Sequence, residues 1–400
     1  MTELAFSLIG EPTPTLTRLL DAFQKLHNVH IRLVKMTWDN AWPELLTYAL
    51  YGKGPDVSHV GSTWASSLIG MNALRPFNRV EVKSTGGPEV FLPQAWQSVL
   101  MPDLPEIWAI PWTTYTFVIC YRRDLLQKAG INEVDAFASE GALDRTLSSM
   151  QAAGIRTPWV VPIDPAHIDT LHFVASWVWG AGGEFVDAVG RHILFAQPNS
   201  LRGIEAYFTL LRYLDPEAWR LDGDGAEACF TSGKAAATIV GADRPYAWLM
   251  NRTVAPEVFN NLGVAVMPGV PWIGGDNLVI WRHTQGLLDV ERSAVGLVNF
   301  LVSHATQTTY CQGEEVYLPT RADALPDLPM PGSSLSQVVV KSLQTGRSYP
   351  AIPMWSKIEH QTSTILGQIG LDILDGTPVE TAVRRHLEPL ANRLEAALGR

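Results

Sequence analysis

Six short clusters combine aromatic side chains with hydroxyl, carboxylate or guanidinium groups, most of them directly after an expected strand or turn. They are Trp38-Asp39, Ser62-Thr63-Trp64, Trp112-Thr113-Thr114-Tyr115, Asp243-Arg244, Gly274-Gly275-Asp276 and Trp355. An indole offers a broad apolar face and one N–H donor. A polyhydroxylated ligand needs stacking faces and a few fixed donors and acceptors, so the clusters together predict a site for such a ligand. Taken singly, each tryptophan also fits a partly buried packing residue.

Motifs for catalysis are absent from the sequence. It has no His-Glu-x-x-His, no Gly-x-Ser-x-Gly, no P-loop and no Gly-x-Gly-x-x-Gly, and no two of its ten histidines form an i,i+4 ligand pair. We therefore expect no catalytic residue, no metal and no cofactor. Paired carboxylates cannot be assigned to one cleft from sequence alone, so a glycoside hydrolase stays as an alternative.

Composition and charge narrow the class of protein. The 400 residues are enough for about two or three domains. Lys and Arg number 30 against 40 Asp and Glu, a formal net charge of −10 that disfavours nucleic acid as a partner. The sequence has 14 Trp, which suits a site for flat hydroxylated ligands, and three cysteines too far apart for a disulfide framework.

The N-terminal residues bear on localisation. Residues 1–10 show no basic segment followed by an apolar stretch and a small-residue cleavage site. Two expectations stay open: a leader has been removed from a protein that works outside the cytoplasmic membrane, or the protein is made without one and stays in the cytoplasm.

The elements that must position the six clusters alternate between strand and helix. Strands are predicted at 4–9, 30–36, 56–61, 109–121, 235–241, 262–267 and 277–282, and helices at 12–27, 42–50, 122–130, 171–180, 200–214, 225–233, 290–303, 363–374 and 378–398. This order predicts an α/β fold with parallel strand pairing at its start. Ligands bind beyond the carboxyl ends of such strands, which here are 10–11, 36–38 and 61–64.

Several segments in order resemble one known family. They are Gly54-Pro55-Asp56-Val57 leading to Gly61-Ser62-Thr63-Trp64, Leu74-Arg75-Pro76-Phe77, Ile110-Pro111-Trp112-Thr113, Tyr121-Arg122-Arg123-Asp124-Leu125-Leu126 with Ala129-Gly130-Ile131, Phe230-Thr231-Ser232-Gly233-Lys234-Ala235-Ala236-Ala237, Gly263-Val264-Ala265-Val266-Met267-Pro268-Gly269, Gly274-Gly275, Asn299-Phe300-Leu301-Val302-Ser303 and Leu318-Pro319-Thr320-Arg321. Their order and spacing resemble the family 1 extracellular solute-binding proteins of ABC importers, the maltodextrin-binding type. The resemblance covers nearly the whole chain.

This resemblance implies a two-lobed periplasmic-binding-protein-like fold of type II, with the ligand cleft between the lobes. The chain would cross between the lobes more than once, so each lobe is discontinuous. We expect lobe 1 to comprise 1–115 and 276–314, and lobe 2 to comprise 116–275 and 315–400. The hinge crossings would lie at 112–115, 272–276 and 313–319, where Gly274, Gly275 and Gly313 can absorb backbone rotation.

The resemblance also assigns ligand-binding positions. Carried over residue by residue, they are Glu11, Trp38, Asp39, Ser62, Trp64, Trp112, Thr114, Asp243, Arg244, Gly275, Asp276 and Trp355. The family often carries Gly-x-Trp where this chain reads Gly241-Ala242-Asp243-Arg244, which suggests a charged contact in place of a stacking one. Arg244 fits two interpretations: an exposed salt bridge with Asp243, or a planar donor fork facing the ligand.

By this resemblance, the protein captures a mono- or oligosaccharide between two closing lobes and delivers it to the membrane subunits of an ABC transporter. It would act as a monomer and without catalysis. A ligand-sensing protein of the same fold that signals to a partner is the second interpretation, and a glycoside hydrolase the third. A polyamine site or a tyrosine-pair iron site has less support in the sequence.

Overall fold

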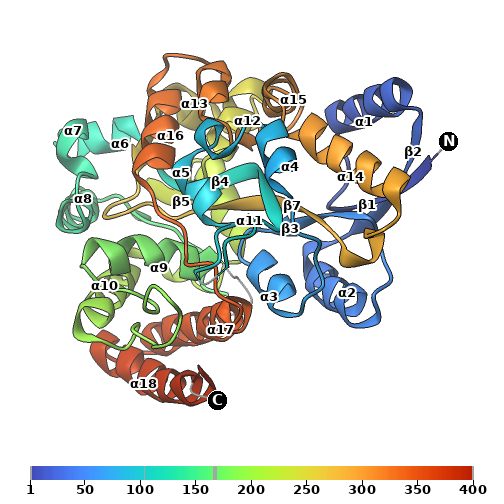
Figure 1. Ribbon diagram of the computed structural model, residues 1–400. Helices are drawn as coiled ribbons and strands as arrows, with labels where there is room; N and C mark the ends of the chain where they lie inside the picture. The colour runs from blue at the N-terminus through green and yellow to red at the C-terminus, as the bar shows by residue number, and fades with distance from the viewer. Residues whose placement is uncertain (1, 103, 165–168, 399–400) are drawn as a thin grey trace. The chain divides into compact units, whose positions relative to one another are not determined.

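The computed structural model describes residues 2–102, 104–164 and 169–398 and divides the chain into two compact units (Figure 1). Unit 1 comprises Met1–Tyr115, Ile273–Pro331 and Ser348–Ser356. Unit 2 comprises Thr116–Trp272, Gly332–Arg347 and Lys357–Arg400. Both units combine helices with β-structure, as the sequence predicts.

Unit 1 is built on a four-stranded path in the order β2-β1-β3-β7. The strands are β1 (Thr2–Ile9), β2 (Val29–Met36), β3 (Val57–Gly61) and β7 (Ile273–Ile280). β1 pairs in parallel with both β2 and β3, which confirms the predicted parallel pairing, and β7 pairs antiparallel to β3. The first half of β4 (Ala109–Arg122) pairs with β8 (Leu318–Pro319) in the same unit.

Helices cover both faces of this sheet. Figure 1 shows α1 (Pro14–His27) and α14 (Leu288–Leu301) on one side of β1 and β2, with α2 (Trp38–Tyr51) on the other. α1 begins where the Thr13 side chain accepts from the Leu16 N–H, and it buries Leu20 and Phe23. The remaining helices of unit 1 are α3 (Ala65–Gly70), α4 (Arg79–Ser84), α5 (Pro93–Gln97), α15 (His304–Cys311) and the 3₁₀ turns η1 (Pro88–Val90), η4 (Arg282–Thr284) and η5 (Ala322–Asp327).

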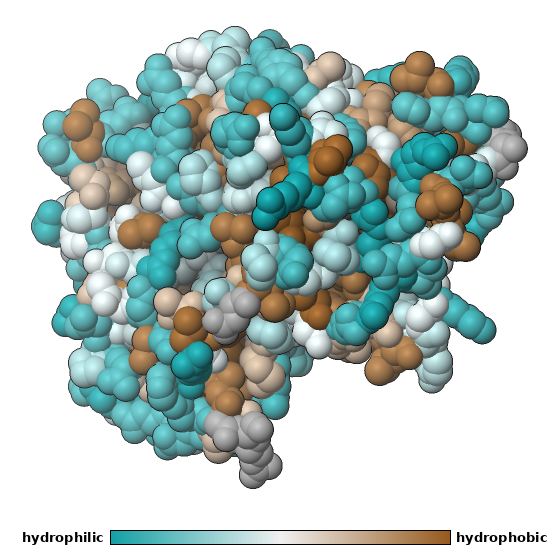
Figure 2. All heavy atoms as spheres, viewed as in Figure 1, coloured by the Kyte–Doolittle hydropathy of each residue, from teal (hydrophilic) through white to brown (hydrophobic). Residues whose placement is uncertain are grey.

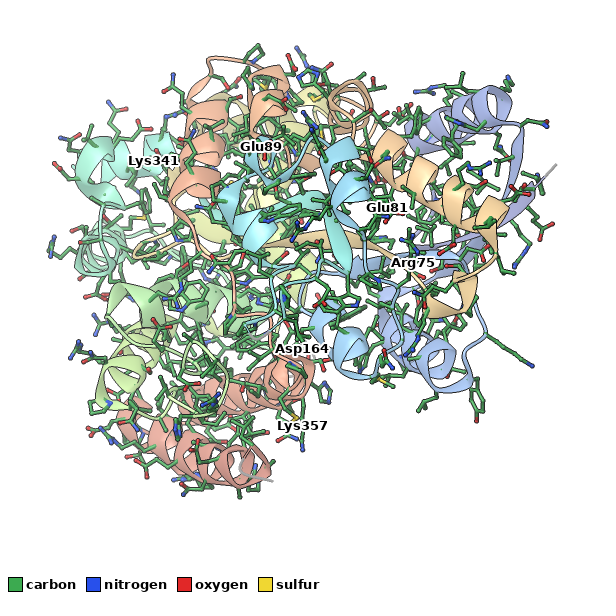
Figure 3. The ribbon with its side chains drawn as sticks, in the orientation of Figure 1. Arg75, Glu81, Glu89, Asp164, Lys341 and Lys357 are labelled. Carbon is green, nitrogen blue, oxygen red and sulfur yellow. The ribbon has the colours of Figure 1, made fainter. Side chains whose placement is uncertain are left out.

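An ion-pair group joins three segments of unit 1. The guanidinium of Arg75 bonds Glu81 at 2.7 and 3.0 Å and Glu291 at 2.8 Å, and Figure 3 labels Arg75 and Glu81. Burial acts to raise the pKa of Glu81, but the bonds from Arg75 and from the Asn78 N–H outweigh it and leave that pKa below its usual value. The Leu74-Arg75-Pro76-Phe77 motif thus ties α4 to α14.

Unit 2 holds a smaller antiparallel sheet surrounded by helices. The second half of β4 pairs with β5 (Ala237–Gly241) and β6 (Leu262–Val266). The helices are α6 (Arg123–Lys128), α7 (Glu133–Ala136), α8 (Glu140–Ala152), α9 (Asp169–Gly180), α10 (Pro198–Thr209), α11 (Gly223–Thr231), α12 (Arg244–Asn251), α13 (Pro256–Asn261), α16 (Ser334–Thr345), α17 (Trp355–Leu374), α18 (Val379–Leu398), η2 (Leu210–Tyr213) and η3 (Pro216–Ala218). α9 and α10 approach so closely at Gly203 that a Cβ there would lie 2.5 Å from the Trp177 carbonyl oxygen. Only glycine fits at this position.

The observed units differ from the expected division in three segments, of which the shortest is 273–275, the start of β7, in unit 1. Residues 315–331 lie in unit 1 because β8 pairs with Thr113 and Thr114 of β4. Residues 348–356 also lie there, held by Ser66 and Ser67, whose hydroxyls donate to the carbonyls of Ile352 and Pro353 at 2.8 Å. The chain therefore leaves unit 1 at Pro331 rather than within 313–319.

Polar side chains cover much of one face of the molecule. Figure 2 shows hydrophilic residues over most of the visible face, with hydrophobic residues in scattered patches. Among the described residues, every helix is either too short or too polar to cross a membrane.

Candidate ligand-binding site

Three indoles gather after β2 and β3 in unit 1. α2 begins directly after β2 because Asn40 Oδ1 accepts from the Thr37 N–H at 2.7 Å, which places Trp38 in the first turn. The Trp38 ring lies 5.5 Å from that of Trp64, which in turn lies 5.6 Å from Trp42. Trp38 keeps 55% of its surface exposed, so it offers an indole face to solvent.

A glycine with positive φ brings β7 against β4 beside these rings. Gly275 has φ +127°, and a Cβ there would lie 2.1 Å from the Thr113 carbonyl oxygen, so no larger residue fits. Its carbonyl accepts from the Ser62 N–H at 2.8 Å. Asp276 then pairs with Gly61 in the β3–β7 register, which puts its carboxylate at the carboxyl end of β3.

The Asp276 carboxylate is held from two sides. Thr113 Oγ1 donates to Oδ2 at 2.6 Å, and Nε2 of His59 lies 3.0 Å from Oδ1. The side chain of Asp276 is still 17% exposed. A carboxylate has about four lone-pair positions, so this one keeps acceptor capacity for a ligand.

Trp112 lies beneath this group as a core residue. Only 1% of its surface is exposed, and its ring stacks on Tyr310 at 5.4 Å with 5° between the planes. The edge of His59 meets the same indole at 5.1 Å. Burial raises the pKa of Tyr310 well above its usual value, so the phenol stays neutral. Trp112 thus supports His59 and has no free face, although it was expected as a ligand-binding position.

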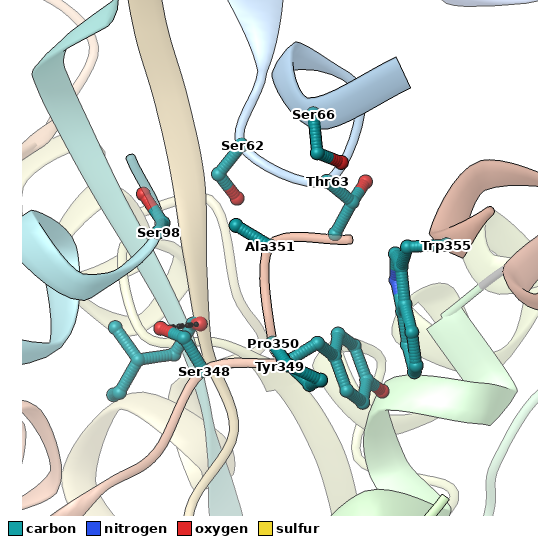
Figure 4. Close-up of a pocket in the computed structure, with 10 residues that line it drawn as sticks. Ser62, Thr63, Ser66, Ser98, Ser348, Tyr349, Pro350, Ala351 and Trp355 are labelled. Atoms are coloured by element: carbon teal, nitrogen blue, oxygen red, sulfur yellow. Dashed lines mark hydrogen bonds between the residues drawn. The ribbon is translucent and has the colours of Figure 1, made fainter. Parts of the chain in front are cut away.

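Hydroxyl groups line a small cavity elsewhere in unit 1 (Figure 4). The cavity measures about 10 Å³, enough for about one water molecule. Figure 4 shows the rings of Tyr349 and Trp355 side by side, and their centroids are 4.2 Å apart. Trp355 is 1% exposed and opens α17. The cavity is lined by Ser62, Thr63, Ser66, Ser98, Ile273, Ser348, Tyr349, Pro350, Ala351 and Trp355.

The other predicted residues of unit 1 fall into two groups. Glu11 and Asp39 are exposed, and Glu11 pairs with Lys35 at 2.8 Å. Thr114 is buried and its hydroxyl donates to the Pro319 carbonyl at 3.3 Å, so it faces away from Asp276. Strand alternation explains this: Thr113 and Thr114 point to opposite faces of β4.

In unit 2, Asp243 and Arg244 lie between β5 and the first turn of α12. Oδ1 of Asp243 is buried and has no hydrogen-bond partner among the described residues. Burial raises the pKa of Asp243 to about 6, against the opposing effect of its own backbone N–H and of Arg244. Arg244 bonds Glu227 at 2.7 to 3.1 Å, and Trp248 Nε1 donates to the same carboxylate at 3.0 Å. The salt bridge of Arg244 is therefore made with Glu227 rather than with Asp243.

The two residues that contact the Asp276 carboxylate were not selected from the sequence. His59 lies in a strand whose five residues are all buried, and Thr113 was named in a cluster without being assigned to the site. A titratable side chain inside an otherwise buried strand was the available signal for His59, because such a group needs buried partners.

The sequence and the structure were compared with those of known proteins. A family model described as bacterial extracellular solute-binding protein matches residues 18–332. Similar solved structures include the Thermotoga lettingae solute-binding protein bound with α-D-tagatose (19% identity, TM-score 0.79, 100% of each chain covered). Others are the sugar-binding protein MalE of Xanthomonas citri (18%, 0.80, 100% of this chain and 98% of that one) and maltose-bound T. maritima MalE3 (19%, 0.79, 99% and 100%). No curated protein sequence matches the chain. The predicted two-lobed α/β fold class is confirmed by these structures.

Proposed function

Because the chain belongs to the bacterial extracellular solute-binding protein family, we propose that it is the carbohydrate-capturing component of an ABC importer. The observation that carries the proposal is that the exposed indole of Trp38 and the half-buried carboxylate of Asp276 both contact His59. An aromatic face and a fixed acceptor are what a sugar ring with its hydroxyls requires. Similar structures carry tagatose or maltose, which supports a small saccharide as ligand.

In this proposal, units 1 and 2 act as the two lobes that close on the ligand. Unit 1 contributes Trp38, Ser62, Trp64 and Asp276, and unit 2 contributes Asp243. A ligand that contacts both units binds the closed form better than the open form, and only that difference in affinity can shift the population. The closed form then presents the sugar to the membrane subunits of the importer, outside the cytoplasmic membrane.

The role is proposed to be non-catalytic, with the protein acting as a monomer. Maltose incubated with the protein for long periods should be recovered unaltered by mass spectrometry. Release of glucose or of a phosphorylated product would replace transport with an enzymatic function.

A thermal-shift screen tests the proposal directly. The panel contains maltose and tagatose as sugars, with amino acids and polyamines as alternatives. A ligand at 100 times its dissociation constant should add about 2.7 kcal/mol to the free energy of unfolding. Stabilisation by an amino acid or a polyamine and by neither sugar would contradict a carbohydrate ligand.

Small-angle scattering tests the closing step. The radius of gyration should fall when a sugar that stabilises the protein is added. The circular dichroism spectrum of the protein should stay the same, because each unit keeps its internal structure. Superimposable scattering curves at saturating sugar would contradict closure.

A further inference from the structure

His59 is a histidine inside a buried strand, and its ring is fixed on several sides. It is 5% exposed and sits in the middle of β3. The Trp38 and Trp112 rings meet it edge-to-face at 6.0 and 5.1 Å. Packing of this kind leaves the imidazole little freedom to rotate, so its two nitrogens have fixed neighbours.

The neighbours of the two nitrogens determine where the proton sits. The Ile9 backbone N–H donates to Nδ1 at 3.2 Å, so Nδ1 must be the unprotonated acceptor. The neutral ring then carries its proton on Nε2. Nε2 is buried and lies 3.0 Å from Asp276 Oδ1, but it forms no hydrogen bond of good geometry with the described residues.

We propose that His59 is a positioning residue of the binding site, an inference that rests on the proposed function. The Thr113 hydroxyl hydrogen-bonds Oδ2, and the His59 Nε2–H, which lies 3.0 Å from Oδ1 without a hydrogen bond of its own, attracts that oxygen electrostatically. Together they hold the Asp276 carboxylate in one orientation and leave its remaining lone pairs for the ligand. Both partners are neutral donors, so the negative charge of Asp276 is not cancelled by a cation. Asp39 adds an exposed negative charge in the same unit, whereas Glu11 is paired with Lys35.

A consequence for the ligand follows from this charge. At Asp276 the ligand must donate a hydrogen bond, through a hydroxyl or a protonated amine. A ligand that brings a carboxylate or a phosphate to this position meets an uncompensated like charge, which disfavours binding. The substrate class is therefore a neutral or amine-bearing saccharide and not an acidic one.

Two substitutions at His59 separate positioning from packing. In His59→Gln the amide nitrogen replaces Nε2 and keeps the donor to Asp276, but the acceptor for Ile9 is lost. In His59→Asn the amide oxygen replaces Nδ1 and keeps the acceptor for Ile9, but the donor to Asp276 is lost. We expect His59→Asn to weaken maltose or tagatose binding by at least about tenfold in calorimetry and His59→Gln by less than about threefold.

Stability should respond in the opposite order. His59→Gln should lower the thermal midpoint more than His59→Asn, because it leaves the buried Ile9 N–H without its acceptor. A purely structural role for His59 predicts that the less stable variant is also the weaker binder. Equal affinity losses in both variants, or a greater loss in His59→Gln, would overturn the proposal.

Selectivity gives a separate readout. Wild-type protein should bind maltose more tightly than maltobionate, the corresponding acid, by at least about tenfold, and Asp276→Asn should reduce that ratio. Equal binding of the two compounds by the wild type would overturn the assignment of ligand class.

Nitrogen-15 NMR of the ligand-free protein tests the His59 arrangement without any sugar. The His59 ring should show a protonated Nε2 and an unprotonated Nδ1, and Asp276→Asn should shift the Nε2 resonance. If the wild type binds neither sugar, the proposed function fails, and the ring-nitrogen measurement alone decides the His59 arrangement. A proton on Nδ1, or an Nε2 resonance indifferent to Asp276→Asn, would refute it.

Discussion

Asp276 in unit 1 and Asp243 in unit 2 are two predicted acceptors for the ligand, and their surroundings differ. Both oxygens of Asp276 have a close partner, Thr113 at 2.6 Å and His59 at 3.0 Å. Oδ1 of Asp243 is buried without a hydrogen-bond partner among the described residues, and burial raises its pKa to about 6. One carboxylate is held by neighbouring residues, and the other has a buried oxygen without a donor among the described residues.

The difference has opposite consequences for stability at the two carboxylates. Orienting Asp276 with neutral donors reduces the reorganisation needed on binding. Leaving Asp243 Oδ1 buried and unpaired lowers the stability of the protein. Substitutions at each carboxylate should therefore change stability in opposite directions.

Removing the support under the oriented carboxylate should have the largest effect. Trp112→Ala deletes a fully buried ring that contacts His59, Phe6 and Tyr310. We expect a loss of about 3–5 kcal/mol in unfolding free energy, because a large cavity is left in the core of unit 1. Urea denaturation followed by circular dichroism measures it. A loss under about 1 kcal/mol would mean that Trp112 packs less tightly than its burial indicates.

Neutralising the unsatisfied carboxylate should stabilise the protein. The native pKa of Asp243 is raised, so the native state binds this proton more tightly than the unfolded chain does. Its contribution to stability is complete below the ordinary Asp value and is lost as pH rises through about 6. Asp243→Asn should therefore add about 2–3 kcal/mol at pH 8.

The pH dependence supplies the control for that substitution. The gain from Asp243→Asn should shrink towards zero near pH 3.5, because the wild-type carboxyl is protonated there as well. Denaturation curves of both proteins from pH 3.5 to 8 make the comparison. A gain that does not change with pH would show that the effect comes from packing and not from charge.

Truncating the oriented carboxylate should do the reverse. Asp276→Ala leaves the Thr113 hydroxyl without its acceptor and removes the carboxylate that lies 3.0 Å from His59 Nε2, which should cost about 1–2 kcal/mol at pH 7. The same urea denaturation measures this loss and allows comparison with the gain expected for Asp243→Asn. If both substitutions move stability in the same direction, the contrast between the two carboxylates is wrong.

Periodic segments were predicted well from the sequence, and two departures have identifiable causes. β7 begins at Ile273, four residues before the predicted strand, because Gly275 serves a close approach inside the strand rather than a turn. α17 begins at Trp355, eight residues early. Its first turns bury Glu359 and Thr362 beside Ile358, and such polar residues on the buried face hide the helical period.

The site could be predicted only in part. Trp38 and Asp276 could be selected as candidate residues because Trp38 comes directly after a predicted strand and Asp276 directly before one. Trp112 and Trp355 have the same residue type as Trp38 but are buried, and residue type does not distinguish a ligand platform from a core ring. The role of Thr113 in place of Thr114 depends on which face of β4 meets β7, and no feature of the local sequence fixes that face.

The smallest effect on stability belongs to Trp38, and it isolates binding from folding. Trp38 is 55% exposed, so Trp38→Ala should change the unfolding free energy by less than about 0.5 kcal/mol. If its indole stacks on a sugar, maltose or tagatose should bind at least about tenfold more weakly, a difference of about 1.4 kcal/mol. Trp219, 39% exposed in unit 2 and outside the predicted site, gives the matched control, and Trp219→Ala should leave affinity unchanged. Equal affinities for the two variants would remove Trp38 from the site and leave Asp276 without its aromatic partner.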